Sequence, residues 1–148
     1  MTSFSVQEVT DWVGGRIANA SVLGSALDQI RIAKAADLGV STPEDVAFFF
    51  SKSYQDELLK AAPGVLITAE PFVKPLEASG LPLWKKTAVI VCADPYLGMA
   101  IVSRRIAQAI STVAHTQLPT SGAPEIHPAA IVHPSVRLGS GVRIDANC

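Results

Sequence analysis

Residues 126–148 repeat with a period of six, and this pattern constrains the fold more than any other feature of the chain. Ile126, Val132, Leu138 and Ile144 are six residues apart. A second row lies two residues before each of the last three and holds Ala130, Val136 and Val142, and Cys148 continues it at the same spacing. A six-residue period fits neither a helix, with 3.6 residues per turn, nor the two-residue alternation of a strand. It is typical of a parallel β-helix, in which each hexapeptide forms one face of a triangular coil.

These repeats make little more than one coil. Repeat folds need about three or more units to bury a continuous core, so this segment is predicted to be unstable alone. A sheet that ends in mid-coil also leaves an open edge, which natural proteins usually cover. We therefore expect the native protein to continue beyond Cys148, the alternative being a partner chain that covers the edge.

Composition excludes several classes of protein. A chain of 148 residues with 49% hydrophobic side chains can bury a core. Its longest apolar run, 88–93, is far shorter than the roughly 20 residues of a membrane helix, and the N-terminus does not resemble a signal peptide. A net charge of −1 argues against nucleic-acid binding. Two cysteines, Cys92 and Cys148, make no disulfide framework, which predicts a reducing cytoplasm.

Helical and strand patterns alternate before the repeats and predict a small α/β domain with a mixed sheet. The expected helices are 4–13, 54–61 and 95–113, and the expected strands are 27–32, 46–50, 65–68 and 88–92. The Pro-rich stretch 70–86 is ambiguous. Residues 115–125 have the composition of a linker. We therefore predict an α/β domain over 1–114, a linker over 115–125 and the start of a β-helix over 126–148.

Several helix ends carry local signals. Ser5 and Glu8 have the spacing of a capping box, and Gly14 with its following glycine is a typical helix stop. Ser53 is the expected cap of the second helix. Asp94, followed by proline, is the expected N-cap of the third.

The chain resembles the N-terminal part of the UDP-3-O-acylglucosamine N-acyltransferase family, commonly called LpxD. The resemblance begins with the capped first helix and its Gly-Gly stop. It continues in DVAFFFSKSYQDEL (45–58), in AVIVCADPYLGMA (88–100) and in EIHPAAIVHPSVRLGSGVRID (125–145). Hexapeptides alone are unspecific, because many acyltransferases carry them. Their combination with the aromatic segment and the Asp-Pro-Tyr helix is much more specific.

This resemblance implies a function in lipid A biosynthesis, in the cytoplasm of a Gram-negative bacterium. The family transfers a 3-hydroxyacyl chain from acyl carrier protein to the 2-amino group of UDP-3-O-acylglucosamine, works as a homotrimer and needs no cofactor. The repeats then become the first coil of a left-handed β-helix. The family's catalytic histidine lies on a later coil, so no catalytic residue is assigned here. The 148 residues alone are predicted to be inactive.

The same resemblance implies a uridine site at Phe48, Ser51 and Tyr54. The two aromatic rings would stack on uracil, which is worth roughly 1–3 kcal/mol per base. Ser51 stands where the family has asparagine. A hydroxyl offers uracil's edge less than the paired donor and acceptor of an amide. The alternative is structural: alternate side chains of Phe48–Phe50 must face the core, and Tyr54 could simply pack at the surface.

Other conspicuous residues are predicted to be structural. His127 and His133 recur in His-Pro turns and should point away from one another, so no metal site is expected. Cys92 is expected to be a small buried hydrophobe. The paired arginines at 104–105 are expected on a solvated helix face.

Two rival functions remain. A non-catalytic nucleotide-sugar-binding or assembly module could keep the α/β domain with a short hexapeptide stub, and the Ser51 departure favours this reading. A different hexapeptide enzyme, such as a sugar acetyltransferase, is the second rival. The Asp-Pro-Tyr helix argues against it.

Overall fold

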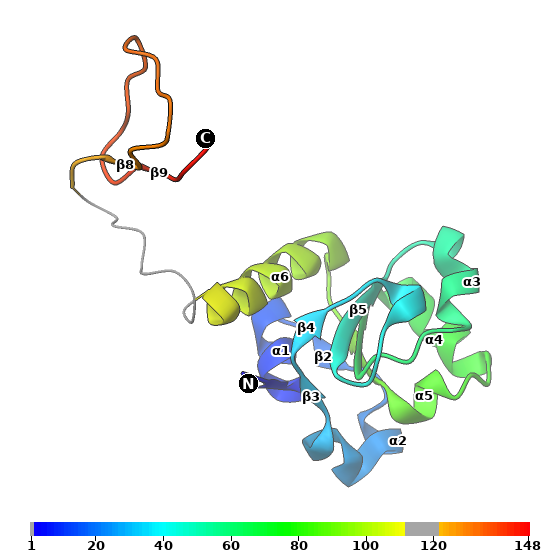
Figure 1. Ribbon diagram of the computed structural model, residues 1–148. Helices are drawn as coiled ribbons and strands as arrows, with labels where there is room; N and C mark the ends of the chain where they lie inside the picture. Colours follow the sequence, from blue (N-terminus) through cyan, green and yellow to red (C-terminus); the bar gives the residue numbers. More distant parts are fainter. Residues whose placement is uncertain (1, 112–121) are drawn as a thin grey trace. The chain divides into compact units, whose positions relative to one another are not determined.

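A computed structural model of the protein describes residues 2–111 and 122–148. The chain divides into two compact units, Met1–Ile110 and Ser111–Cys148 (Figure 1). Most of the predicted linker, 115–125, and with it His115, lies outside the described residues. Its boundaries stay predictions.

The first unit is built on a five-stranded mixed sheet in the order β2-β7-β6-β5-β4. Strands β4, β5, β6 and β7 are parallel, and β2 is antiparallel at one edge. Their bounds are Arg16–Ile17 (β2), Lys34–Ala35 (β4), Asp45–Phe49 (β5), Val65–Thr68 (β6) and Ala88–Val91 (β7). A separate antiparallel pair joins β1 (Phe4–Ser5) to β3 (Arg31–Ile32). The predicted α/β class with a mixed sheet is therefore confirmed.

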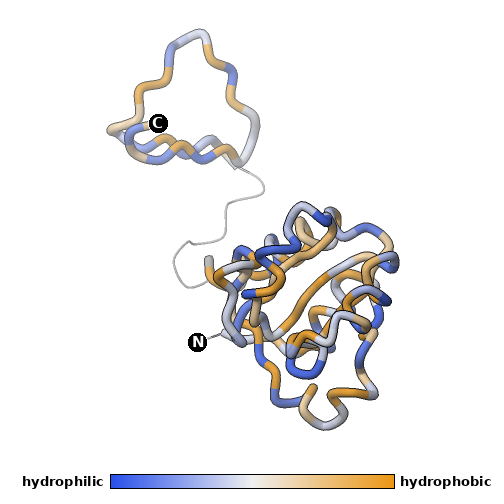
Figure 2. The backbone as a smooth tube through the Cα atoms, turned by 90° about the vertical axis from the view of Figure 1, so that its right-hand side faces the viewer, coloured by the Kyte–Doolittle hydropathy of each residue, from blue (hydrophilic) through white to orange (hydrophobic). Residues whose placement is uncertain are grey.

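Helices cover both faces of this sheet. On one face α1 (Val6–Val13) and α6 (Pro95–Ser111) pack on side chains that include Val46, Ile67 and Ile90. The other face packs against α3 (Gln55–Leu58), α4 (Glu70–Ala78) and α5 (Leu83–Lys86). The shorter elements are α2 (Ala20–Leu23), η1 (Gly24–Gln29), η2 (Leu38–Val40) and η3 (Lys52–Tyr54). Strands β6 and β7 are buried along their whole length and include a single polar residue, Thr68, as a parallel sheet covered on both faces requires. Long hydrophobic stretches run through the first unit (Figure 2).

The ends of α1 follow the sequence signals. Glu8 N donates to Ser5 Oγ at 3.2 Å, and Ser5 N donates to Glu8 Oε2 at 2.7 Å, which completes the predicted capping box. Gly14, at φ 59°, ends the helix in the left-handed conformation. Gly15 has a different role, because a Cβ there would lie 2.5 Å from the carbonyl oxygen of Val91.

Four local predictions were wrong. The strand expected over 27–32 is mostly the 3-10 helix η1, and only Arg31–Ile32 is a strand. Leu27 and Ile30 are three residues apart, a spacing that also fits a 3-10 turn, and Ile30 N donates to Leu27 O. The cap is Ser51 rather than the expected Ser53, since the Ser51 hydroxyl accepts from Ser53 N. Of the expected helix 54–61, only Gln55–Leu58 is α-helical. The helix expected from residue 4 begins at Val6.

The second unit contains one parallel strand pair, β8 (Glu125–Ile126) and β9 (Arg143–Ile144). Each residue pairs with the one 18 positions later, which equals three six-residue repeats. Turns at the two His-Pro sequences close with bonds from Ala130 N to His127 O and from Val136 N to His133 O. The half-buried residues of this unit, apart from Gly141, all belong to the two repeat rows: Ala130, Val132, Leu138, Val142 and Ile144.

No helix in the part of the chain that the structure describes combines the length and the apolar character needed to cross a bilayer.

Candidate functional site

A groove of about 400 Å³ lies where β4 and β5 end. In open sheets with parallel strands, ligands bind in crevices outside the carboxyl ends of the strands. Here the loop after β4, the segment after β5 and the first turns of α6 supply the walls. The residues that line this aromatic groove are Ala36, Asp37, Leu38, Gly39, Phe48, Phe50, Tyr54, Glu57 and Met99.

The aromatic side chains reach the groove because successive residues of β5 point to opposite faces of the sheet. Phe48 is half-buried against the core that α1 and α6 cover. Phe49 is buried on the other face, so this member of the Phe48–Phe50 run is structural, as the alternation required. Phe50 lies against Tyr96, with 4.2 Å between ring centroids. Tyr54 is 50% exposed, so part of its ring is free for a ligand.

Two of the three predicted site residues share this groove. Phe48 and Tyr54 both line it, and Ser51 lies in the segment that connects them without contributing to the lining. The Ser51 hydroxyl accepts from Ser53 N at 3.3 Å and lies 3.2 Å from the Ser53 hydroxyl. Its visible role is to cap η3 and thereby to set the position of Tyr54.

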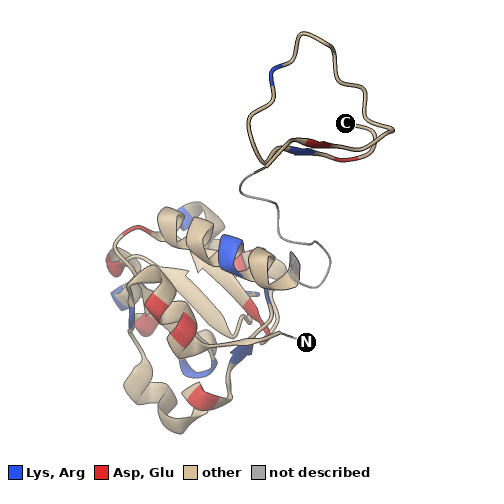
Figure 3. Ribbon diagram, turned by 90° about the vertical axis from the view of Figure 1, so that its left-hand side faces the viewer, with Lys and Arg blue, Asp and Glu red and all other residues tan. Residues whose placement is uncertain are grey.

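The charged residues that line the aromatic groove are acidic. Asp37 and Glu57 contribute carboxylates, and no lysine or arginine is among the lining residues. Elsewhere on the first unit, acidic and basic residues are interspersed (Figure 3). A groove with carboxylate acceptors and aromatic faces suits a neutral ring with N–H groups better than a phosphate group.

Sequence reasoning missed Phe50, Asp37, Glu57 and Met99 as lining residues. The carboxyl-edge rule would have pointed to the loop that holds Asp37. It could not be applied because β4, only two residues long, leaves no detectable pattern in the sequence.

Other reactive side chains have structural partners. Burial, together with the nearby charge of Asp94, raises the pKa of the Cys92 thiol, which disfavours the thiolate. Asp94 caps α6, since its Oδ1 accepts from Tyr96 N and Leu97 N, each at 3.0 Å. His127 and His133 accept backbone bonds within their turns, and among residues 2–111 and 122–148 no three metal-ligating side chains gather.

No protein-family model matches the sequence. The chain is similar to the UDP-3-O-acylglucosamine N-acyltransferase of Bordetella pertussis, with 26% identity over 123 residues. The predicted resemblance is confirmed. The match covers 83% of this chain and 31% of the acyltransferase, so the chain spans about a third of that relative's length.

Proposed function

We propose that the first unit is a nucleotide-sugar-binding domain that holds the uridine of UDP-3-O-acylglucosamine in the aromatic groove. The observation that carries this proposal is the position of Phe48 and Tyr54 in one groove at the carboxyl edge of the sheet. The similarity to an N-acyltransferase acting on that substrate class supports it.

In this proposal uracil stacks between Phe48 and Tyr54, and its N3–H donates to a carboxylate of the groove. Base stacking contributes roughly 1–3 kcal/mol, and a matched hydrogen bond at the ring edge gives selectivity against cytosine, whose N3 is an acceptor. The diphosphate points out of the groove, because Asp37 and Glu57 would repel it.

The domain then serves an acyltransferase of lipid A biosynthesis in the cytoplasm of a Gram-negative bacterium. That enzyme would move a 3-hydroxyacyl chain from acyl carrier protein to the 2-amino group of the sugar, as a homotrimer. Residues 126–148 would form the first coil of its left-handed β-helix, which the 18-residue offset of the parallel pair supports. No residue here corresponds to the family's catalytic histidine, so these 148 residues should bind substrate without acylating it.

Calorimetric titration with UDP tests the site. Tyr54→Ala should weaken UDP binding about tenfold, since it removes one stacking face. Leu59→Ala is the matched control, because Leu59 is similarly exposed and lies outside the aromatic groove. CDP should bind more weakly than UDP. Equal affinities of the two variants, or equal binding of UDP and CDP, would contradict the proposed mode.

The second candidate is a non-catalytic nucleotide-sugar-binding or assembly module. Ser51 favours it, because the hydroxyl is engaged in a local cap where the family has an amide. The gene sequence after the codon for Cys148 separates the two candidates. Many more hexapeptides with a histidine among them would favour the acyltransferase, and a stop codon would favour the module.

A further inference from the structure

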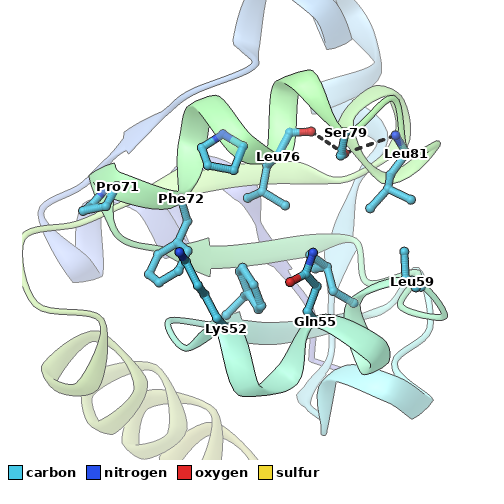
Figure 4. Close-up of a pocket in the computed structure, with 11 residues that line it drawn as sticks. Lys52, Gln55, Leu59, Pro71, Phe72, Leu76, Ser79 and Leu81 are labelled. Carbon is cyan, nitrogen blue, oxygen red and sulfur yellow. Dashed lines mark hydrogen bonds between the residues drawn. The ribbon is translucent and has the colours of Figure 1, made fainter.

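A second groove, of about 690 Å³, lies on the opposite face of β5. We call it the α3–α4 groove, because η3 and α3 form one wall and α4 with the loop after it forms the other (Figure 4). Phe49, Leu58 and Leu76, all buried, belong to its lining. Its volume is within the range of small-molecule sites, about 300–1,000 Å³.

The wall formed by α4 is apolar and stiff. Pro71 and Pro75 are four residues apart, so they lie on the same side of the helix and both line the groove. Proline has no backbone N–H and a fixed φ, which limits how far this wall can rearrange. Between them Phe72 packs edge-on against Phe49, with 5.1 Å between ring centroids. A ligand would therefore meet a preformed surface and lose little affinity to ordering it.

The opposite wall carries the available polar groups. Lys52 and Gln55 are three residues apart, and both side chains face α4 (Figure 4). Lys52 forms no salt bridge with any residue that the structure describes. The third polar side chain of the lining, Ser79, is already engaged: its hydroxyl donates to Leu76 O at 2.6 Å and accepts from Leu81 N at 3.3 Å.

The charge of the groove decides what fits it. Its lining includes one cation and no carboxylate. A single ammonium beside an amide donor matches one carboxylate, which accepts from both groups. A diphosphate would bring a second negative charge without a second cation, and a cationic ligand would be repelled. The rest of the surface requires an apolar chain or ring.

We propose that the α3–α4 groove binds an amphiphilic monocarboxylate, a fatty acid in its simplest form. The apolar chain lies against Phe72 and the two prolines of α4, and the carboxylate accepts from Lys52 Nζ and the Gln55 amide. This site is distinct from the uridine site, because the two grooves have no lining residue in common.

Calorimetry of the whole chain with dodecanoate, below its micelle concentration, tests the site. We expect one dodecanoate per chain, and binding of dodecyltrimethylammonium, with the same tail and the opposite charge, about tenfold weaker. Lys52→Met should weaken dodecanoate binding about fivefold, as the loss of one charge-assisted bond would. Lys60→Met is the matched control: it removes an exposed lysine that does not line the groove and should leave the affinity unchanged.

A second variant tests the apolar wall. Leu59 is 62% exposed, so Leu59→Asp should fold normally, as circular dichroism would verify, while its charge lowers dodecanoate affinity at least about tenfold. Absence of dodecanoate binding would overturn the proposal. So would equal binding of the two amphiphiles, or equal effects of Lys52→Met and Lys60→Met.

Discussion

Asn19 is a buried polar side chain that makes three hydrogen bonds in the core of the first unit. It is 1% exposed. Its Nδ2 donates to Trp84 O at 2.7 Å and to Thr87 O at 2.8 Å, and its Oδ1 accepts from Val89 N at 2.9 Å. One side chain thus connects the segment after β2 to α5, to the residue before β7 and to β7 itself.

Asn19→Ala should lower the free energy of unfolding by about 2–4 kcal/mol, because it leaves three buried backbone groups without a partner. Urea denaturation measures this. Ser21→Ala, an exposed change two residues away, should stay within about 0.5 kcal/mol of the parent. A similarly small effect at Asn19 would mean that water replaces all three bonds.

The distance between partners explains which single residues can be predicted from sequence. Phe48 and Tyr54 lie on neighbouring elements, so a local resemblance brings them to one groove. The partners of Asn19 lie 65 to 70 residues away in the sequence, and nothing near Asn19 indicates them. Gly64 is similar: its neighbour Pro63 marks a helix break, but the close approach of the Pro43 carbonyl is visible only in the fold.

Among the elements, α1 has an N-terminal cap whose contribution to stability depends on pH. The backbone and hydroxyl hydrogen bonds of Ser5 lower the pKa of Glu8 below its ordinary 4.5. The unfolded chain therefore binds this proton more tightly than the native chain does, so stability rises with pH across that window. The contribution is complete well above pH 4.5 and is lost as the pH falls through the lowered folded pKa.

Glu8→Gln isolates this contribution. At pH 7 it should cost about 0.5 kcal/mol, the low end for a helix cap, because Glu8 is exposed and screened by water. Chemical denaturation at pH 7 and pH 3 should show the difference between parent and variant shrinking toward zero at the lower pH. Gln7→Glu is unsuitable as a control, since Gln7 bonds Asp11. Ser3→Ala, outside the capping box, is the matched neutral change and should show no such pH dependence.

Elements differ in how well their sequence predicts them. Strands β5, β6 and β7 are predictable because burial on both faces makes most of their residues apolar, with Asp45 and Thr68 at strand ends as the exceptions. The Pro-rich stretch 70–86 was ambiguous and contains α4, in which Pro75 is tolerated inside the helix, and α5. Tertiary packing through Leu76 and Leu83 stabilises helices that local propensity disfavours.

For the whole molecule, the described residues of the first unit form two apolar clusters of their own. The members of both clusters lie between Phe4 and Ile106. A chain that ends at Ser111 should therefore unfold cooperatively with a melting temperature within about 2 °C of the parent, well below the shift of 4–8 °C that 1 kcal/mol produces in a domain of this size. Differential scanning calorimetry measures this. A large drop would mean that the repeats stabilise the first unit.

The 18-residue separation of the paired residues Ile126 and Ile144 determines how the height of such a repeat would increase with its length. Each strand pairs in parallel with the strand 18 residues earlier. The free edge of the later strand therefore presents the same pattern of backbone donors and acceptors as the edge that it covered. Height would then grow by one strand spacing, about 4.8 Å, for each 18 residues, while the cross-section stays constant. In the proposed β-helix, an insertion of 18 residues would keep both aliphatic rows in register with the existing coil. An insertion of one residue within a strand would turn the aliphatic side chains after it to the opposite face of that strand.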